Sequence, residues 1–165
     1  MAASVCRVLM VYPAFFGETF WNYSEVCKLV GARYTAAPLG LITVAAMLPQ
    51  SWDVRLINRN TEDLSEADVA WADVVMTGGM LLQQADTLEI VGLAHKHAKH
   101  AAVGGPDVTS SPHLYAGADF LILGEAEASS TISSRPGSGV SGRAPSKRKN
   151  SPSTLLRRRS RASIF

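Results

Sequence analysis

Three histidines stand close together in the sequence, at His95, His97 and His100. Neutral imidazole is a common metal ligand, so this spacing first suggests a metal site. If the segment is helical, however, His95 and His97 point about 200° apart, and only His97 and His100 share a face. No cysteine or carboxylate stands at a matching spacing. We therefore predict no metal site here, but a helix end whose dipole favours basic residues.

Glycines and polar residues form a second group, because they follow every apolar run of the chain. Glycine lets the backbone approach a large planar or phosphate-bearing ligand closely. The alternative is that each glycine only allows the chain to turn. We favour the ligand-binding interpretation for the set as a whole, which comprises Tyr12-Pro13, Asn58 to Asn60, Thr77-Gly78-Gly79, Gly104-Gly105-Pro106 and Gly124-Glu125.

The nucleophile–base pairings of hydrolases are absent in any recognisable spacing. The two cysteines, Cys6 and Cys27, make no disulfide framework and match a reducing compartment, so we expect a cytoplasmic protein. The longest apolar stretch, residues 39–48, is about half of the ~20 residues that a membrane-spanning helix needs. We therefore expect no contact with a membrane.

The elements that must position these residues are five short apolar runs separated by helix-like stretches. Continuous apolar strands that alternate with helices are typical of a parallel sheet covered on both faces. The sequence therefore predicts an α/β fold with a doubly wound, five-stranded parallel sheet. Its strands are expected within Val5–Pro13, Trp52–Asn58, Asp73–Met80, Ala101–Pro106 and Asp119–Glu127.

Two of the predicted helices carry clear signals. Ser65 with Asp68 three residues later resembles a capping box. A second helix ends before Pro49, and one of its faces carries Leu39, Ile42, Thr43, Ala46 and Met47. After the fifth strand a covering helix is due, but none is apparent. We therefore expect one face of the sheet to be partly bare.

Charge divides the chain into two unlike parts. Residues 1–128 hold 7 Lys and Arg against 14 Asp and Glu, whereas residues 129–165 hold 9 basic residues, 11 serines and no acid. Such a tail cannot bury enough apolar surface to offset its ordering entropy. We predict a folded domain over 1–128 and a disordered basic tail over 129–165.

Four stretches together resemble the N-terminal cobalamin-binding domain of cobalamin-dependent radical S-adenosylmethionine enzymes. They read "APLGLITVAAMLPQSWDVRLIN", "WADVVMTGGM", "AVGGPDVTSSP" and "GADFLILGEAE", in the order and spacing of that family. The resemblance covers roughly residues 5–128. It implies a Rossmann-like, flavodoxin-type domain that holds cobalamin against the carboxyl ends of the strands, where ligands of such sheets bind.

The resemblance also assigns residues to the site. Tyr12 and Pro13 follow the first strand, and the helix start near the corrin would be formed by Pro38, Leu39 and Gly40. The cleft for the nucleotide tail would be lined by Thr77, Gly78 and Met80. A wall of the site would be formed by Gly104, Gly105 and Pro106, and the site would be closed by Gly124 and Glu125.

The chain departs from the cobalamin mutases at the loop after the first strand. Those domains carry Asp-x-His-x-x-Gly there, and the histidine ligates cobalt, but this loop reads "YPAFFGETFWNYSEVC" and has no histidine. The resemblance therefore implies cobalamin without a histidine ligand from this loop. The aromatic residues of the loop are expected either to pack against the corrin or to cover the core, namely Phe15, Phe16, Phe20 and Trp21.

The resembled enzymes carry out their chemistry in a following barrel, where three cysteines hold an iron–sulfur cluster that cleaves S-adenosylmethionine. This chain has two cysteines, so we expect those cofactors only in a full-length relative and no catalysis by this chain alone. The loss of resemblance after Glu127 coincides with the loss of hydrophobic periodicity. We expect the tail to be a frameshifted or truncated end of a longer enzyme.

Two alternatives remain for the function of the chain. One is a stand-alone flavodoxin-like ligand-binding or receiver-type module, although the acidic residues of a receiver are missing at "VYPAF" and "VMTGG". The other is an enzyme of unrecognised type that uses the same cleft. The basic tail, which lacks interleaved aromatic residues, is expected to contact polyanions nonspecifically rather than to recognise nucleic acid.

Overall fold

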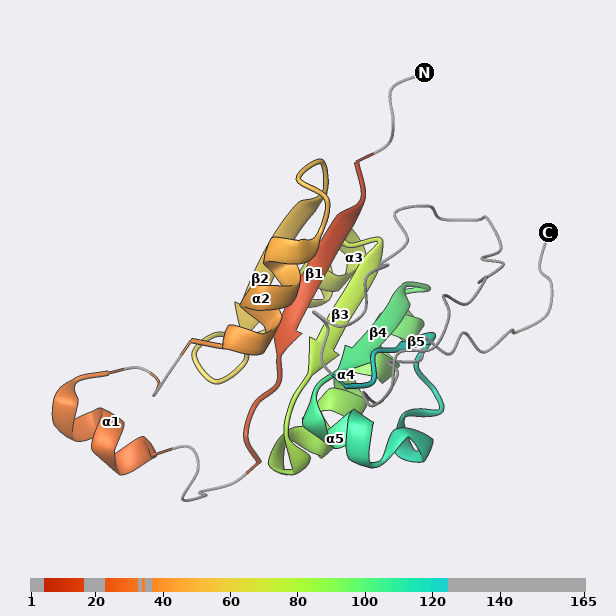
Figure 1. The fold of residues 1–165 in the computed structure, drawn as a ribbon. Coiled ribbons are helices and arrows are strands. Elements are labelled where there is room, and N and C mark those ends of the chain that lie inside the picture. Colours follow the sequence, from red (N-terminus) through yellow and green to blue (C-terminus); the bar gives the residue numbers. More distant parts are fainter. Residues whose placement is uncertain (1–4, 17–22, 33, 35–36, 125–165) are drawn as a thin grey trace, which may run out of the picture.

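The computed structural model describes residues 5–16, 23–32, 34 and 37–124. Within them the chain alternates strands and helices, as the sequence predicts (Figure 1). In chain order the elements are β1 (Arg7–Tyr12), α1 (Ser24–Val30), α2 (Leu39–Met47), β2 (Asp53–Asn58), α3 (Glu66–Trp71), β3 (Val74–Gly78), η2 (Leu81–Gln83), α4 (Gln84–Lys96), β4 (His100–Gly104), α5 (Pro106–Ser110), η3 (Pro112–Tyr115) and β5 (Phe120–Leu121).

The strands form a five-stranded sheet in the order β2-β1-β3-β4-β5. Every neighbouring pair is parallel. The predicted α/β class, parallel sheet and strand number are therefore confirmed, and the order is that of flavodoxin-type folds. Four of the predicted apolar runs contain a whole strand, and β4 begins one residue before the predicted run Ala101–Pro106.

The sheet separates two layers of apolar side chains because successive strand residues point to opposite faces. On β1, Leu9 and Val11 belong to the larger layer, whereas Val8 and Met10 belong to the smaller one. Both pairs are fully buried, which explains the continuous apolar character of this central strand.

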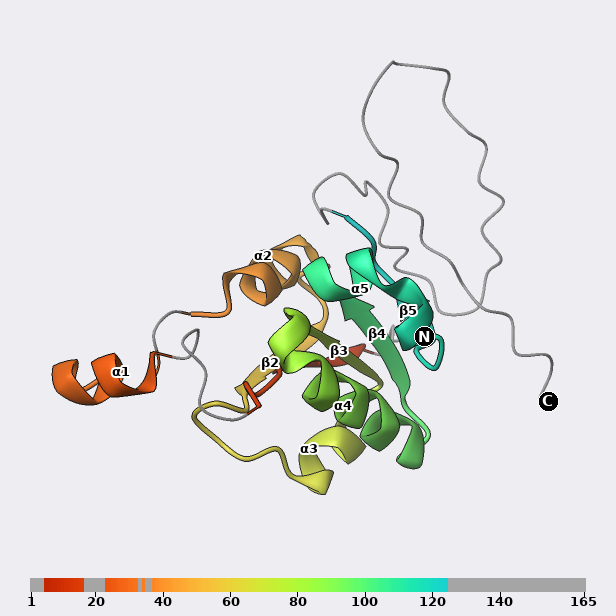
Figure 2. The same ribbon diagram turned by 90° about the horizontal axis from the view of Figure 1, so that it is seen from below.

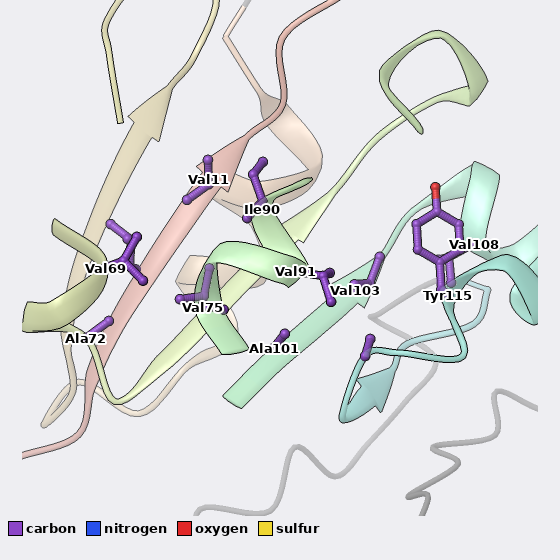
Figure 3. Close-up of a cluster of buried hydrophobic side chains, with 13 residues drawn as sticks. Val11, Val69, Ala72, Val75, Ile90, Val91, Ala101, Val103, Val108 and Tyr115 are labelled. Carbon is purple, nitrogen blue, oxygen red and sulfur yellow. The ribbon is translucent and has the colours of Figure 1, made fainter. Parts of the chain in front are cut away.

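Helices cover the two faces of the sheet unequally. The larger layer, shown in Figure 3, packs under α3 and α4 through residues such as Val69, Ile90 and Val91. Leu41 and Val44 of α2 pack on the smaller layer. Figure 2 shows the sheet between α2 on one side and α3 and α4 on the other, with α1 standing apart.

Local signals explain the helix boundaries. Ser65 accepts a hydrogen bond from the backbone N–H of Asp68 at 3.2 Å, so the predicted capping box is confirmed. The predicted helix before Pro49 is α2, but its Leu39, Ile42 and Met47 face is exposed. An apolar surface therefore remains open on this helix.

Several predictions fall on residues that the structure does not describe. The missing covering helix after β5, the disordered tail over 129–165 and the site residue Glu125 lie outside the described residues, as do Phe20 and Trp21. In the described part of the chain, no helix combines the length and apolar character needed to cross a membrane.

Candidate functional site

The carboxyl ends of the parallel strands meet at one edge of the sheet, which Figure 2 shows from the side to which the strands point. There Tyr12 pairs with Asn58, Val11 pairs with Thr77, and Gly78 pairs with Gly104. Because α2 runs back toward the start of β2, its first residues lie at the same edge. The fold thus gathers most of the predicted site residues.

The two double glycines at this edge contact each other. A Cβ atom on Gly78 would lie 2.1 Å from the carbonyl oxygen of Gly104. A Cβ atom on Gly105, whose φ is +100°, would lie 3.2 Å from the backbone nitrogen of Gly79. These glycines are therefore needed for the close approach of β3 and β4. Their proposed contact with a ligand remains a prediction.

Two other predicted site residues are buried. The hydroxyl of Thr77, which is 2 % exposed, donates a hydrogen bond to the Val11 carbonyl at 2.9 Å. Pro38 is buried at the N-cap of α2. Both residues lie beneath the surface of this edge. A ligand could therefore contact only a small part of either side chain.

Pro13 is also buried, whereas several other predicted residues are more open. Gly40 has no atom within 4 Å of the position that a Cβ would take. Pro106 is exposed at the first turn of α5. Gly124 is exposed in a left-handed conformation (φ 78°), and its N–H donates to Thr109 Oγ1 at 3.0 Å. These positions leave room for a ligand beside the strand ends.

Exposed apolar side chains form a rim at this edge, which we define as Phe16, Leu39, Met80 and Leu81. They are 80 %, 68 %, 40 % and 69 % exposed, respectively. Phe16 lies beside η2 because its N–H donates to the carbonyl of Leu82 at 3.4 Å. A ligand with an apolar surface would bury this rim.

The segment after β1, residues 13–16, is held by side chains that the sequence interpretation did not assign to the site. Asn60 and Gln83 both donate to the carbonyl of Pro13, at 3.0 and 2.6 Å. Asp86 accepts from the N–H of Ala14 at 2.6 Å. We call residues 13–16 the β1 loop and these three side chains the clasp.

Arg59 extends the clasp to the strand end. Its N–H donates to the Tyr12 carbonyl at 3.0 Å, and its Nη1 lies 3.0 Å from Asp86 Oδ1 without the alignment of a hydrogen bond. Burial raises the pKa of Asp86, although the Ala14 N–H and Arg59 act in the opposite direction. Asn58 to Asn60 stood out in the sequence, but nothing marked Gln83 or Asp86.

An aromatic cluster accompanies the β1 loop. The ring of Tyr34 lies 6.1 Å from that of Tyr12 and 6.3 Å from that of Phe15, measured between centroids. Burial, followed by a hydrogen bond with Tyr12, raises the pKa of Tyr34. Tyr34 is therefore neutral at physiological pH, and the cluster places three aromatic rings beside the β1 loop.

The three neighbouring histidines lie at the opposite edge of the sheet. His95 is in the last turn of α4, as expected, but His97 caps the helix and His100 begins β4, so the shared helix face predicted for them is wrong. Asp119 lies between His95 and His100, at 2.9 and 3.7 Å. Across the described residues, no group of three possible ligands is arranged to hold a metal.

Comparisons with known proteins identify relatives that match about three quarters of this chain. An uncharacterized methyltransferase of Synechocystis sp. is 48% identical over 123 residues, and the hopanoid C-2 methylase of Rhodopseudomonas palustris is 36% identical over 122 residues. These alignments cover 73% and 72% of this chain, but 23% of each relative. No solved structure matches the chain.

The family comparison agrees with the fold. Residues 29–132 match the model of the B12 binding domain. This span covers the rim on α2 and η2, both double glycines and the strands β2 to β5. The resemblance inferred from the sequence is confirmed at the level of the cobalamin-binding domain, and the chain belongs to the B12-binding domain family.

Proposed function

We propose that the chain binds cobalamin across the carboxyl edge of its sheet, as the cofactor-binding part of a methyltransferase of the radical S-adenosylmethionine type. The single observation that carries the proposal is the apolar rim of Phe16, Leu39, Met80 and Leu81 at that edge. Exposed apolar side chains that gather at the ligand-binding edge of such a sheet are typical of a binding surface.

The described residues suit a corrinoid. The rim offers apolar contact to the macrocycle, and the open position at Gly40 leaves space at the start of α2. Half-buried Tyr12 and exposed Pro106 would contribute to the border of the site, and buried Pro13 would support it from within. Cobalamin, when bound, supplies a cobalt centre that can carry a methyl group. The part of this chain is to bind and orient the corrin and to exclude water from it.

We further propose that no histidine of the β1 loop ligates the cobalt. The described residues of that loop are Pro13, Ala14, Phe15 and Phe16, and their backbone is already held by the clasp. The aromatic cluster would then face the cofactor in place of a ligand. The iron–sulfur cluster and S-adenosylmethionine would belong to the further length of the relatives.

The organisation proposed from the sequence accords with this function. Residues 1–128 would form the cofactor domain, and the basic residues of 129–165 would contact polyanions nonspecifically. We propose a cytoplasmic location because two free cysteines suit a reducing compartment.

Titration of the full chain with hydroxocobalamin tests the proposal, with the absorption spectrum and retention on desalting as readouts. Leu81→Ser, on the rim, should weaken binding about tenfold because it removes the buried area of one leucine side chain. Val5→Ser is the matched control, since Val5 is 55 % exposed just before β1 at the opposite edge. Loss of all corrin colour from folded wild-type protein would refute the function.

A further inference from the structure

Each of the four residues of the β1 loop makes a backbone hydrogen bond to a later segment of the chain. The carbonyl of Pro13 accepts from Asn60 and Gln83, the N–H of Ala14 donates to Asp86, and the N–H of Phe15 donates to Asn60 Oδ1 at 3.0 Å. The N–H of Phe16 donates to Leu82. Chain segments that follow β2 and β3 thus hold four consecutive residues after β1.

Gln83 is the most constrained member of the clasp. Its side chain is 1 % exposed, and both ends of its amide are used, because Oε1 accepts from the N–H of Met80 at 3.1 Å while Nε2 donates to Pro13. An apolar side chain of the same size would fill this space without the cost of burying an amide. The polar residue therefore serves to define the position of the β1 loop relative to η2.

Asn60 has the corresponding position on the other side of the loop. Its Nδ2 donates to the Pro13 carbonyl and to Asn58 Oδ1, and its Oδ1 accepts from Phe15. One amide thus fixes the backbone on both sides of Ala14. Half-buried Asn60 and buried Gln83 thus form a hydrogen-bonded network that favours a single arrangement of the loop.

The clasp determines where the aromatic cluster and the apolar rim lie, and these are the surfaces that a ligand would contact. The backbone that it holds carries Phe15, which belongs to the aromatic cluster, and Phe16, which belongs to the rim. Met80 of the rim is held by the same Gln83 amide. Apolar groups from two strand ends are therefore set relative to one another by one buried side chain.

We propose that Gln83 and Asn60 are positioning residues for the cofactor, which hold the β1 loop so that the aromatic cluster and the rim form one preorganised binding surface. The inference rests on the proposed function, because the ligand is the corrinoid proposed above. Neither side chain needs to touch it. Preorganised surfaces bind more tightly because less ordering is required on association.

The test compares Gln83→Met and Asn60→Ala with Val69→Ala in the full chain. Val69 of α3 is 1 % exposed, so its truncation lowers stability without touching the carboxyl edge. Urea unfolding measures stability, and hydroxocobalamin titration measures affinity. Each side chain that must be ordered on association weakens binding about two- to tenfold, and both Phe15 and Phe16 would lose their fixed positions. We therefore expect about a tenfold loss in both clasp variants and less than about twofold in Val69→Ala.

A purely structural clasp predicts the opposite pattern. Wild-type affinity in folded Gln83→Met and Asn60→Ala, or an equal loss in a Val69→Ala protein of the same stability, would overturn the inference and leave the proposed function intact. Failure of the wild-type chain to retain hydroxocobalamin would refute the proposed function, and the inference with it.

If both clasp variants fail to fold, hydrogen exchange on the wild-type chain tests the positioning role of the clasp instead. Amide exchange in segments 14–16 and 58–60 should already be slow in the free chain and change little when hydroxocobalamin binds, because a preorganised surface needs no further ordering. Fast exchange of both segments in the free chain, slowed only by the bound corrinoid, would overturn the inference.

Discussion

Replacement of Gly78 by alanine should destabilise the domain severely. The new methyl group would lie 2.1 Å from the carbonyl oxygen and 2.7 Å from the carbonyl carbon of Gly104, whereas ordinary contacts begin at 3.4 Å. Because Gly78 and Gly104 are paired across β3 and β4, no side-chain rotation relieves the clash. The strand ends would have to separate by about 1 Å, a form of overpacking that costs about 1–3 kcal/mol.

We expect Gly78→Ala to lower the free energy of unfolding by about 3 kcal/mol, at the upper end of that range. This loss is a large share of the roughly 5–15 kcal/mol by which a typical domain is stable. Urea unfolding, followed by far-ultraviolet circular dichroism and tryptophan fluorescence, measures the loss. A Gly78→Ala protein within about 0.5 kcal/mol of wild type would show that β3 and β4 are not closely packed at this point.

Gly40→Ala is the matched counterpart of Gly78→Ala. No atom lies within 4 Å of its Cβ position, and Gly40 is in the first turn of α2. Alanine should therefore stabilise the chain by about 0.5–1 kcal/mol. If the open space at Gly40 receives the corrin, hydroxocobalamin affinity should nevertheless fall. Unchanged affinity would remove Gly40 from the site.

Three further substitutions test single contacts by urea unfolding. Ser65→Ala removes the cap of α3 and should cost about 1 kcal/mol, whereas Ser65→Asp should not. Tyr115→Phe removes the buried hydroxyl that bonds Asp107 and should cost about 1–2 kcal/mol. Burial would raise the pKa of Asp119, but the Ala101 N–H and His95 outweigh it and lower this pKa. The stability that Asp119 contributes is thus present above its unfolded pKa and lost as pH falls, so Asp119→Asn should flatten the acid limb of stability against pH.

The central strands of the sheet, β1, β3 and β4, could be predicted from the sequence because they are buried on both faces. On β1 the residues Val8 to Val11 are all fully buried, and this produces a continuous apolar run that needs no tertiary information to recognise. The capping box of Ser65 and Asp68 is equally local. By contrast, α5 begins at Pro106, directly after Gly105, and its five residues are too few to show a helical period.

The role of the double glycines could not be predicted in the same way. A glycine after a strand signals a turn or a close approach, but the sequence does not say what approaches. Strand order decides that β3 lies beside β4, and this order brings Gly78 against Gly104. The approaching group is the neighbouring backbone. Any contact of these glycines with a ligand would be an addition to that role.

The clasp shows why polar site residues are the hardest to find. Gln83 and Asp86 lie in a segment of mixed polarity, where local pattern predicts an exposed helical surface. Both are instead turned inward, because the β1 loop offers a carbonyl and an N–H that need partners. Such partners are fixed only when β1 and β3 are neighbours. A buried polar residue of this kind therefore depends on topology, and its function has to be sought in the backbone that it holds.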